Sequence, residues 1–393
     1  MIRKVRPPAP WRYAIMIAGD RDDTGGLDPW RRLRILDAPV VALRCLLDSV
    51  RISGGEGAIG ESRESETGPG RIADGFFQGA EPLLRSAANH LRDPHPDLSV
   101  SMLKALDNRC GVRPDHWRCR DLVLDLRKRP LIMGILNLTP DSFSDGGRFV
   151  DSGLAAEEVF KMAEQGADIV DLGGESTRPG AERLSPEEEW ARVQPALNRI
   201  AGRLNVPISI DTYKASVACR AIDSGAEIIN DITALTGDPE MLPLAIESNA
   251  GVVLMHMRET PATMQQNPQY DDVAREVFLF LHRRARACIQ EGVEPDRIAI
   301  DPGIGFGKTL EHNLDLIRQL GYFTSCGLPV LSGPSRKSFL GKILDAPASD
   351  RLEGTIAAVV ASVLNGASIV RVHDVLPVAR AIKVAAAIQK QNL

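Results

Sequence analysis

Beyond Pro130 the chain alternates short apolar runs with longer amphipathic segments. The runs have the length and β-branched content of buried strands, and they predict eight strands, at 131–137, 168–173, 207–211, 227–231, 251–256, 298–301, 329–332 and 368–373. The other segments predict helices at 153–166, 186–203, 214–224, 239–248, 271–291, 309–320, 351–365 and 376–389. Ser185, followed by Pro186 and acidic residues, is a strong start signal for the second helix.

Eight strand–helix units in about 260 residues predict an α/β fold of the (β/α)8 TIM-barrel type, which usually takes about 250 residues. A doubly wound open sheet is the alternative. The barrel is favoured because nearly every predicted strand ends in a polar residue, and in a closed barrel these side chains converge at one face. The polar strand ends are Asn137, Asp171, Asp211, Asn230, Asp231, His256, Asp301, Ser332, Arg371 and His373.

Residues 1–112 do not follow this pattern and are interpreted as an N-terminal extension of unknown function. The tract at 54–70, GGEGAIGESRESETGPG, is almost free of apolar residues and predicts a flexible linker. Segments 40–50 and 80–91 on either side could form short amphipathic helices. A small domain, a disordered extension and sequence upstream of the true start all stay open for this region.

The barrel domain is placed at 113–393, because the pattern changes just before its first strand. The segment WRCRDLVLDL, at 117–126, predicts a short hairpin laid against the bottom of the barrel.

Composition narrows the class of protein. A net charge of −5 argues against a nucleic-acid partner or an anionic membrane surface. No apolar run approaches the roughly 18 residues that span a membrane. The six cysteines form no C-x-x-C pair, which favours a reduced, cytoplasmic protein. Cys110, Cys119 and His116 do not match the spacing of a standard zinc site.

The glycine-rich segment DPGIGFGKT, at 301–309, invites a phosphate-loop interpretation but does not fit one. Its first glycine, Gly303, is one residue too close to Gly307-Lys308-Thr309 for a Walker A loop. The glycines are better explained as tight turns beside Asp301.

Three acceptor-bearing residues, Asp211, Asn230 and Asp301, end predicted strands three, four and six. A buried carboxylate is costly without a partner, and a flat heterocycle with a row of N–H donors would supply one. Backbone amides at the starts of the loops are the alternative partners. Lys337, just beyond strand seven, faces the same mouth and is a candidate for binding a substrate oxygen or nitrogen.

Two basic residues, Arg371 and His373, share one face of the last predicted strand. With Arg178, in the loop GGESTRPGA at 173–181, and Asn137 they could surround a leaving phosphate group and its magnesium ion. Met255, at the end of strand five, either lines a pocket or fills a gap in the core.

From about residue 117 onward the chain resembles the dihydropteroate synthases. The resemblance is carried, in order, by MGILNLTPDSFSDGG, GADIVDLGGESTRPGA, SIDTYK, IINDI, LMHM, IDPGIGFGKT, SGPSRKSFLG and RVHDV. It implies a (β/α)8 transferase that condenses 6-hydroxymethyl-7,8-dihydropterin diphosphate with 4-aminobenzoate, giving 7,8-dihydropteroate and diphosphate in folate biosynthesis. It further implies a Mg2+ cofactor, sulfonamide competition with 4-aminobenzoate, and a homodimer.

The resemblance also implies roles for individual residues. The magnesium ligand would be Asn137, and the pterin pocket would comprise Asp211, Asn230, Met255, Asp301 and Lys337, with Arg371 against the pterin. His373, with Asn137, would meet the diphosphate. The mobile loops would carry Phe143, Thr177 and Arg178, and the 4-aminobenzoate site would include Pro179 and Ser338. The expected catalytic residues are Asp211, Asp301, Lys337, Arg371 and His373.

Two other functions remain open from the residues. A methyltetrahydrofolate-type methyltransferase would share the barrel and the pterin pocket, although the GESTRPGA and SGPSRKS blocks argue against it. A catalytically silent paralogue that only binds pterin or a partner protein is less expected, because Asn137, Arg178, Lys337 and His373 are all present.

Overall fold

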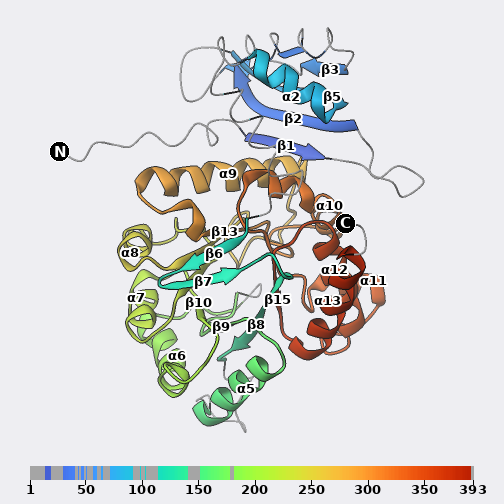
Figure 1. Ribbon diagram of the computed structural model, residues 1–393. Coiled ribbons are helices and arrows are strands. Elements are labelled where there is room, and N and C mark those ends of the chain that lie inside the picture. Colours follow the sequence, from blue (N-terminus) through green and yellow to red (C-terminus); the bar gives the residue numbers. More distant parts are fainter. Residues whose placement is uncertain are drawn as a thin grey trace, which may run out of the picture. The chain divides into compact units, whose positions relative to one another are not determined.

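The structure is a computed structural model that describes residues 14–18, 30–39, 43, 46–47, 50, 56–59, 63–64, 71–91, 98, 102, 114–139, 151–177 and 181–390 (Figure 1). It divides into two compact units. One comprises Asp115–Val277, Glu291–Leu320 and Pro329–Leu393, and the other comprises Met1–Pro114, Phe278–Gln290 and Gly321–Leu328.

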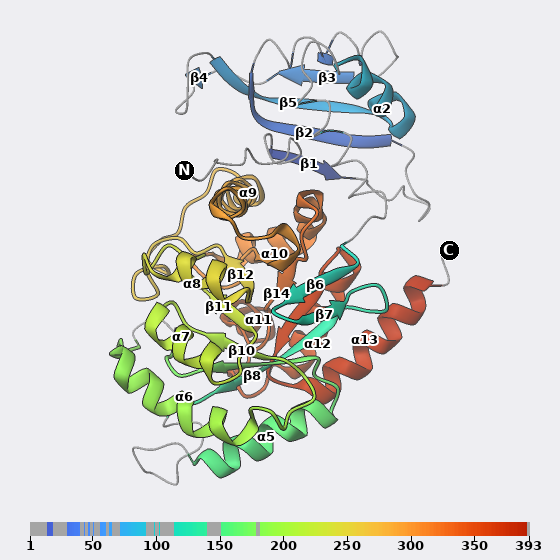
Figure 2. The ribbon, with the colours of Figure 1, turned by 60° about the vertical axis from the view of Figure 1, so that its left-hand side comes forward.

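The larger unit contains the predicted barrel (Figure 2). Its eight parallel strands pair in the order β13-β12-β11-β10-β9-β8-β15-β14, and a parallel bridge between Ile300 and Val330 joins the two ends. The closed barrel, rather than the open sheet, is therefore confirmed. The strands are β8 (Leu131–Asn137), β9 (Ile169–Gly173), β10 (Ile208–Asp211), β11 (Ile228–Asp231), β12 (Gly251–Met255), β13 (Ile298–Asp301), β14 (Leu331–Ser332) and β15 (Ile369–Val372).

All eight predicted helices are present within two residues or so of their expected starts. They are α5 (Ser152–Glu164), α6 (Pro186–Ile200), α7 (Ala215–Asp223), α8 (Met241–Ser248), α9 (Val273–Glu291), α10 (Leu310–Arg318), α12 (Leu352–Leu364) and α13 (Val375–Lys390). The pattern missed α11 (Ser338–Leu344), which is too short to show a helical period, and the 3-10 segments η2 (Pro295–Arg297) and η3 (Leu320–Cys326). None of the helices in the described residues is long and apolar enough to cross a membrane.

The start of α6 shows why the local sequence folds as it does. The Ser185 hydroxyl accepts from the Glu188 amide at 3.2 Å, and the Glu188 carboxylate accepts from the Ser185 amide at 2.8 Å. This reciprocal cap, with proline in the first turn, satisfies amides that have no partner within the helix. The predicted start signal is confirmed, and it fixes where the loop after β9 must end.

A two-stranded hairpin of β6 (His116–Cys119) and β7 (Leu122–Asp125) packs at the bottom of the barrel, as predicted. Trp117 is fully buried and donates its indole N–H to the Arg297 carbonyl at 2.9 Å. The hairpin shares one apolar cluster with inward-facing residues of the strands, among them Leu131, Met133, Ile169, Ile228, Val253, Ala299, Leu331 and Ile369. The lower half of the barrel is therefore solid core, and polar chemistry is confined to the upper half.

The smaller unit contains an antiparallel sheet with strands in the order β1-β2-β5-β3, and β4 also pairs with β5. The elements are β1 (Ala14–Ala18), β2 (Trp30–Pro39), β3 (Glu56–Ile59), β4 (Arg63–Glu64), β5 (Arg71–Ala80) and helix α2 (Glu81–His90). The helix predicted at 80–91 is confirmed. The linker prediction for 54–70 is wrong at β3 and β4, because main-chain pairing with β5 is available there and composition does not reveal it.

Candidate active site

The upper half of the barrel is lined by side chains that alternate with core positions. Met133 and Ile169 lie in the lower core, so every second residue after them also faces inward. Strand register places Asp211 opposite both Gly173 and Asn230, and Met255 opposite Asp301. The predicted convergence of Asn137, Asp211, Asn230, Met255, Asp301 and Arg371 at one mouth is thus a consequence of strand register.

Three other polar strand ends do not face the mouth. Asp231 accepts from the amides of Thr233 at 2.7 Å and Leu235 at 2.9 Å. The Ser332 hydroxyl lies 3.0 Å from that of Ser362 on α12. Like His256, described below, they support loops and helices around the barrel, because their side chains fall on the outer face of the strand or beyond its end.

Arg371 is the centre of the polar mouth. Its Nε donates to Asp171 Oδ2 at 2.6 Å, and its Nη2 donates to Asp211 Oδ2 at 2.6 Å. Asn230 Nδ2 donates to the same Asp171 oxygen at 3.0 Å. Three residues predicted to bind substrate therefore share a network with Asp171, which is fully buried and was not assigned to the site from sequence. Asp171 lies two residues after the inward-facing Ile169, and this spacing was the feature of the sequence that could have assigned it to the site.

The two predicted pocket carboxylates, of which Asp301 is buried and Asp211 partly buried, are electrostatically unlike surface aspartates. Burial raises the pKa of Asp211 to about 7, and the nearby Arg371 charge opposes the rise. Burial also raises the pKa of Asp301. Two groups oppose this rise: the Gly303 amide, which donates to Asp301 Oδ1 at 2.7 Å, and the charge of Lys337. Backbone capping thus explains one oxygen of Asp301. It does not explain Asp211, whose Oδ2 accepts from Arg371.

Lys337 lies against the glycine-rich turn after β13. Its Nζ is 4.0 Å from the centroid of the Phe306 ring. A Cβ at Gly305, where φ is +84°, would come within 2.8 Å of Lys337 Cδ, and a Cβ at Gly303, where φ is +69°, would lie 2.0 Å from the His256 carbonyl oxygen. The glycines let the main chain approach these groups closely, which confirms the tight-turn interpretation of this segment.

Lys308, the lysine of the same segment, is buried. Its Nζ donates to the Phe306 carbonyl at 2.8 Å and lies 3.0 Å from His256 Nδ1. Burial lowers the pKa of Lys308 to about 7 and that of His256 to about 2. This pair holds the turn that carries Phe306.

His373 sits beside the loop that follows β14. The Ser335 hydroxyl accepts from the His373 amide at 3.2 Å and lies 2.9 Å from His373 Nδ1. Either atom can donate in this contact, and when the hydroxyl donates to Nδ1 the ring proton lies on Nε2. Burial and the charge of Arg371 lower the pKa of His373 to about 3, so the ring is a neutral N–H donor.

Asn137 ends β8 at the rim of this network. A Cβ built on Gly173 would lie 3.7 Å from both Asn137 Oδ1 and Asp211 Oδ2. The Asn137 amide is half-buried and makes no hydrogen bond within the part of the chain that the structure describes. A free amide oxygen beside carboxylates fits Mg2+, which takes few protein ligands and completes its shell with water and substrate phosphate.

The remaining predicted residues lie around the mouth or in the loops. Ser338 is exposed at the start of α11, and Thr177 is half-buried. Met255 is buried in a cluster with Ile232, Met264 and Phe306, which fits gap-filling as well as pocket lining. Phe143, Arg178 and Pro179 lie outside the described residues.

Known proteins resemble the barrel unit closely. The family model described as a pterin binding enzyme matches residues 133–373. A dihydropteroate synthase of Synechocystis sp. is 46% identical over 284 residues, which cover 72% of this chain and 98% of that protein. The Bacillus subtilis dihydropteroate synthase is 46% identical over 260 residues, covering 66% of this chain and 89% of the relative.

Solved structures agree. A Yersinia pestis dihydropteroate synthase with a sulfonamide drug complex has a TM-score of 0.67 at 41% identity and covers 70% of this chain and 99% of its own. A Xanthomonas albilineans dihydropteroate synthase with 4-aminobenzoic acid has a TM-score of 0.66 at 40% identity, covering 70% and 98%. Matches of this identity over nearly the full length of the relatives show that the chain belongs to the dihydropteroate synthase family of pterin-binding enzymes.

Proposed function

We propose that this chain condenses 6-hydroxymethyl-7,8-dihydropterin diphosphate with 4-aminobenzoate, releasing diphosphate and forming 7,8-dihydropteroate. The observation that carries the proposal is the partly buried Arg371 bridge between Asp171 and Asp211 at the mouth of a barrel of this family. Family membership removes the methyltransferase alternative, since the matched relatives are dihydropteroate synthases along 89–98% of their length.

The pterin is proposed to bind across Asp211, Asn230 and Asp301. Carboxylate and amide oxygens of these residues would accept from the ring N–H groups, and Lys337 would donate to a ring oxygen or nitrogen. Positive charge that develops on the pterin as the diphosphate leaves is stabilised by the two buried carboxylates. The raised pKa values of Asp211 and Asp301 fit carboxylates placed where little water can solvate them.

The departing diphosphate is proposed to meet His373, Asn137 and Arg371. The neutral His373 ring offers its Nε2–H to a phosphate oxygen, and Arg371 supplies positive charge close to the breaking bond. Asn137 would hold Mg2+, which when bound neutralises charge on the leaving diphosphate. The amine of 4-aminobenzoate then attacks the methylene carbon directly, so no protein nucleophile is needed.

The 4-aminobenzoate site is proposed to include Thr177, Arg178, Pro179, Ser338 and Phe143. Support comes from the relatives, since one solved structure contains 4-aminobenzoic acid and another a sulfonamide. Closure of the two loops would exclude water that could otherwise capture the reactive carbon.

Purified protein is expected to release diphosphate only when the pterin diphosphate, 4-aminobenzoate and Mg2+ are all present. Stopping the reaction with EDTA and restoring it with Mg2+ would test the role of the metal. A coupled diphosphate assay with each component omitted in turn measures all three requirements. Diphosphate release that does not depend on 4-aminobenzoate would refute the synthase activity, and no release at all would leave the silent pterin-binding paralogue.

The barrel unit is further proposed to form a homodimer through the helices after β13. Large apolar side chains are exposed on α10, α11, α12 and α13, namely Leu314, Ile343, Leu344, Leu364, Val384 and Ile388. Exposed apolar groups gathered on neighbouring helices are typical of an interface between copies.

Sedimentation equilibrium should therefore give twice the 42.7 kDa mass of one chain. Ile343→Glu and Val384→Glu are expected to shift the protein to the monomer, because each buries a charge if the interface forms. Leu122→Glu, on the hairpin at the bottom of the barrel, is the matched control and should stay dimeric. A monomeric wild-type protein would refute the proposal.

A further inference from the structure

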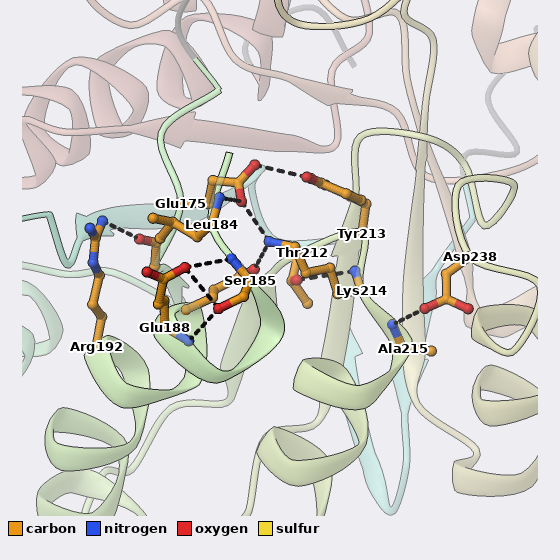
Figure 3. Close-up of polar contacts among 12 residues, drawn as sticks. Glu175, Leu184, Ser185, Glu188, Arg192, Thr212, Tyr213, Lys214, Ala215 and Asp238 are labelled. Atoms are coloured by element: carbon orange, nitrogen blue, oxygen red, sulfur yellow. Dashed lines mark hydrogen bonds and ion pairs between the residues drawn. The ribbon is translucent and has the colours of Figure 1, made fainter. Parts of the chain in front are cut away.

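A buried ion cluster fastens the loop between β9 and α6, and the proposed mechanism does not use it (Figure 3). Glu175 begins this loop, and its Oε2 accepts from the main-chain amide of Leu184 at 3.0 Å, nine residues later in the sequence. The intervening segment contains Thr177 and Arg178. One carboxylate thus ties the beginning of the loop to its end.

The same carboxylate is tied to the neighbouring strand end. Lys214 Nζ donates to Glu175 Oε2 at 2.5 Å, and the Tyr213 hydroxyl donates to Glu175 Oε1 at 2.9 Å. Tyr213 and Lys214 lie two and three residues after Asp211, the last residue of β10. The start of the loop is therefore held by residues that follow β10, the strand that carries the pterin-pocket residue Asp211.

A third charged residue holds the cluster against helix α6. Lys214 Nζ also donates to Glu189, which lies in the first turn of α6 and is only 1% exposed. Gly174 lets the loop pack on this turn, because a Cβ there would come within 2.9 Å of Glu189 Cγ and Val193 Cγ2. Arg192, also on α6, donates to the Gly174 carbonyl at 3.1 Å.

The energetics explain why such a cluster holds one geometry. Glu175 and Lys214 are 9% and 11% exposed, so water does little to compensate a broken contact. Removing one partner from a buried ion pair leaves an uncompensated charge, and this costs far more than losing a surface pair. The cluster therefore holds the two described ends of the loop, at Glu175 and Leu184, in one arrangement.

We propose that Glu175 and Lys214 are positioning residues that set affinity for the second substrate by fixing both ends of the 176–183 segment. They would act through Thr177, which follows Glu175 by two residues, and would not touch either substrate. The inference rests on the proposed function, because it requires 4-aminobenzoate to bind at this loop. When the ends of the loop are already held, less conformational entropy is lost on substrate binding, and the affinity is higher.

The test compares the KM of each substrate in variants of the cluster. Glu175→Gln is expected to raise the KM for 4-aminobenzoate about 10- to 100-fold, the size expected for losing hydrogen bonds to a charged group. The KM for the pterin diphosphate should stay within about twofold, because Asp211 and Asn230 keep their contacts. Calorimetric binding of a sulfonamide to the complex with pterin diphosphate should weaken by the same factor.

Three further variants make the test selective. Tyr213→Phe removes only the hydroxyl contact and should raise the KM for 4-aminobenzoate about threefold. This variant still tests the proposal if Glu175→Gln does not fold. Lys214→Met should resemble Glu175→Gln, and Lys214→Arg should restore most of the affinity. Glu187→Gln is the matched control, since Glu187 is exposed on the same turn of α6 and should behave as wild type.

The two proposals fail in different ways. If the wild-type chain shows no 4-aminobenzoate-dependent diphosphate release, the proposed function fails. If the wild type is active but the variants raise both KM values equally, or alter thermal stability with unchanged KM values, the positioning role is refuted and the cluster only stabilises the fold.

Discussion

Asp211→Asn is expected to lower kcat/KM for the pterin diphosphate by about 100- to 1,000-fold, the usual loss when one preorganised electrostatic group is removed. The neutral amide cannot stabilise positive charge on the pterin, and it replaces an acceptor oxygen with a donor. It also leaves Arg371 with a single carboxylate partner, Asp171. Steady-state kinetics with 4-aminobenzoate held at saturation measures this loss.

The pH profile gives a second readout of the same residue. Burial raises the pKa of Asp211, so its carboxylate is protonated at a higher pH than an ordinary aspartate. If the charged form is required, kcat/KM falls as the pH drops through that raised pKa, and Asp211→Asn abolishes this acid limb. Asp315→Asn, on the exposed side of α10, should keep the wild-type profile. If kcat/KM of Asp211→Asn still falls at low pH as in the wild type, a group other than Asp211 is responsible for that fall.

Asp171→Ala is expected to destabilise the fold by about 3–5 kcal/mol, the cost of removing one partner from a buried ion pair. Asn230 loses the Asp171 oxygen to which it donates, and Arg371 loses one of its two carboxylate acceptors and keeps only Asp211. Activity should fall as well, because both residues belong to the proposed pterin pocket. Urea denaturation at pH 7 measures the change in the free energy of unfolding.

Two companion variants separate charge from hydrogen bonding at this position. Asp171→Asn keeps one acceptor oxygen and should lose less stability than Asp171→Ala, although its activity falls with the lost charge. Glu158→Ala, in an exposed pair with Lys161 on α5, should change stability by less than about 1 kcal/mol. Wild-type stability in Asp171→Ala would show that Asp211 alone can hold Arg371.

The sequence by itself determined the barrel and most of its mouth. Alternating apolar runs placed the eight strands within two residues of their observed bounds, since a buried parallel strand needs an uninterrupted apolar run. Their polar ends placed Asp211, Asn230, Asp301 and Arg371 at the mouth, although the same rule also selected Asp231, His256 and Ser332, which face away from it. These features are local, and the residues that encode them are neighbours along the chain.

Only the tertiary structure decided which of these groups contact one another. Asp171 and Arg371 are 200 residues apart, and Glu175 and Lys214 are 39 apart, so no local pattern pairs them. The pairing follows from barrel closure, which brings β9, β10 and β15 around one centre. The sequence alone therefore supplied the polar side chains, and the register between distant strands decided which charges are buried together.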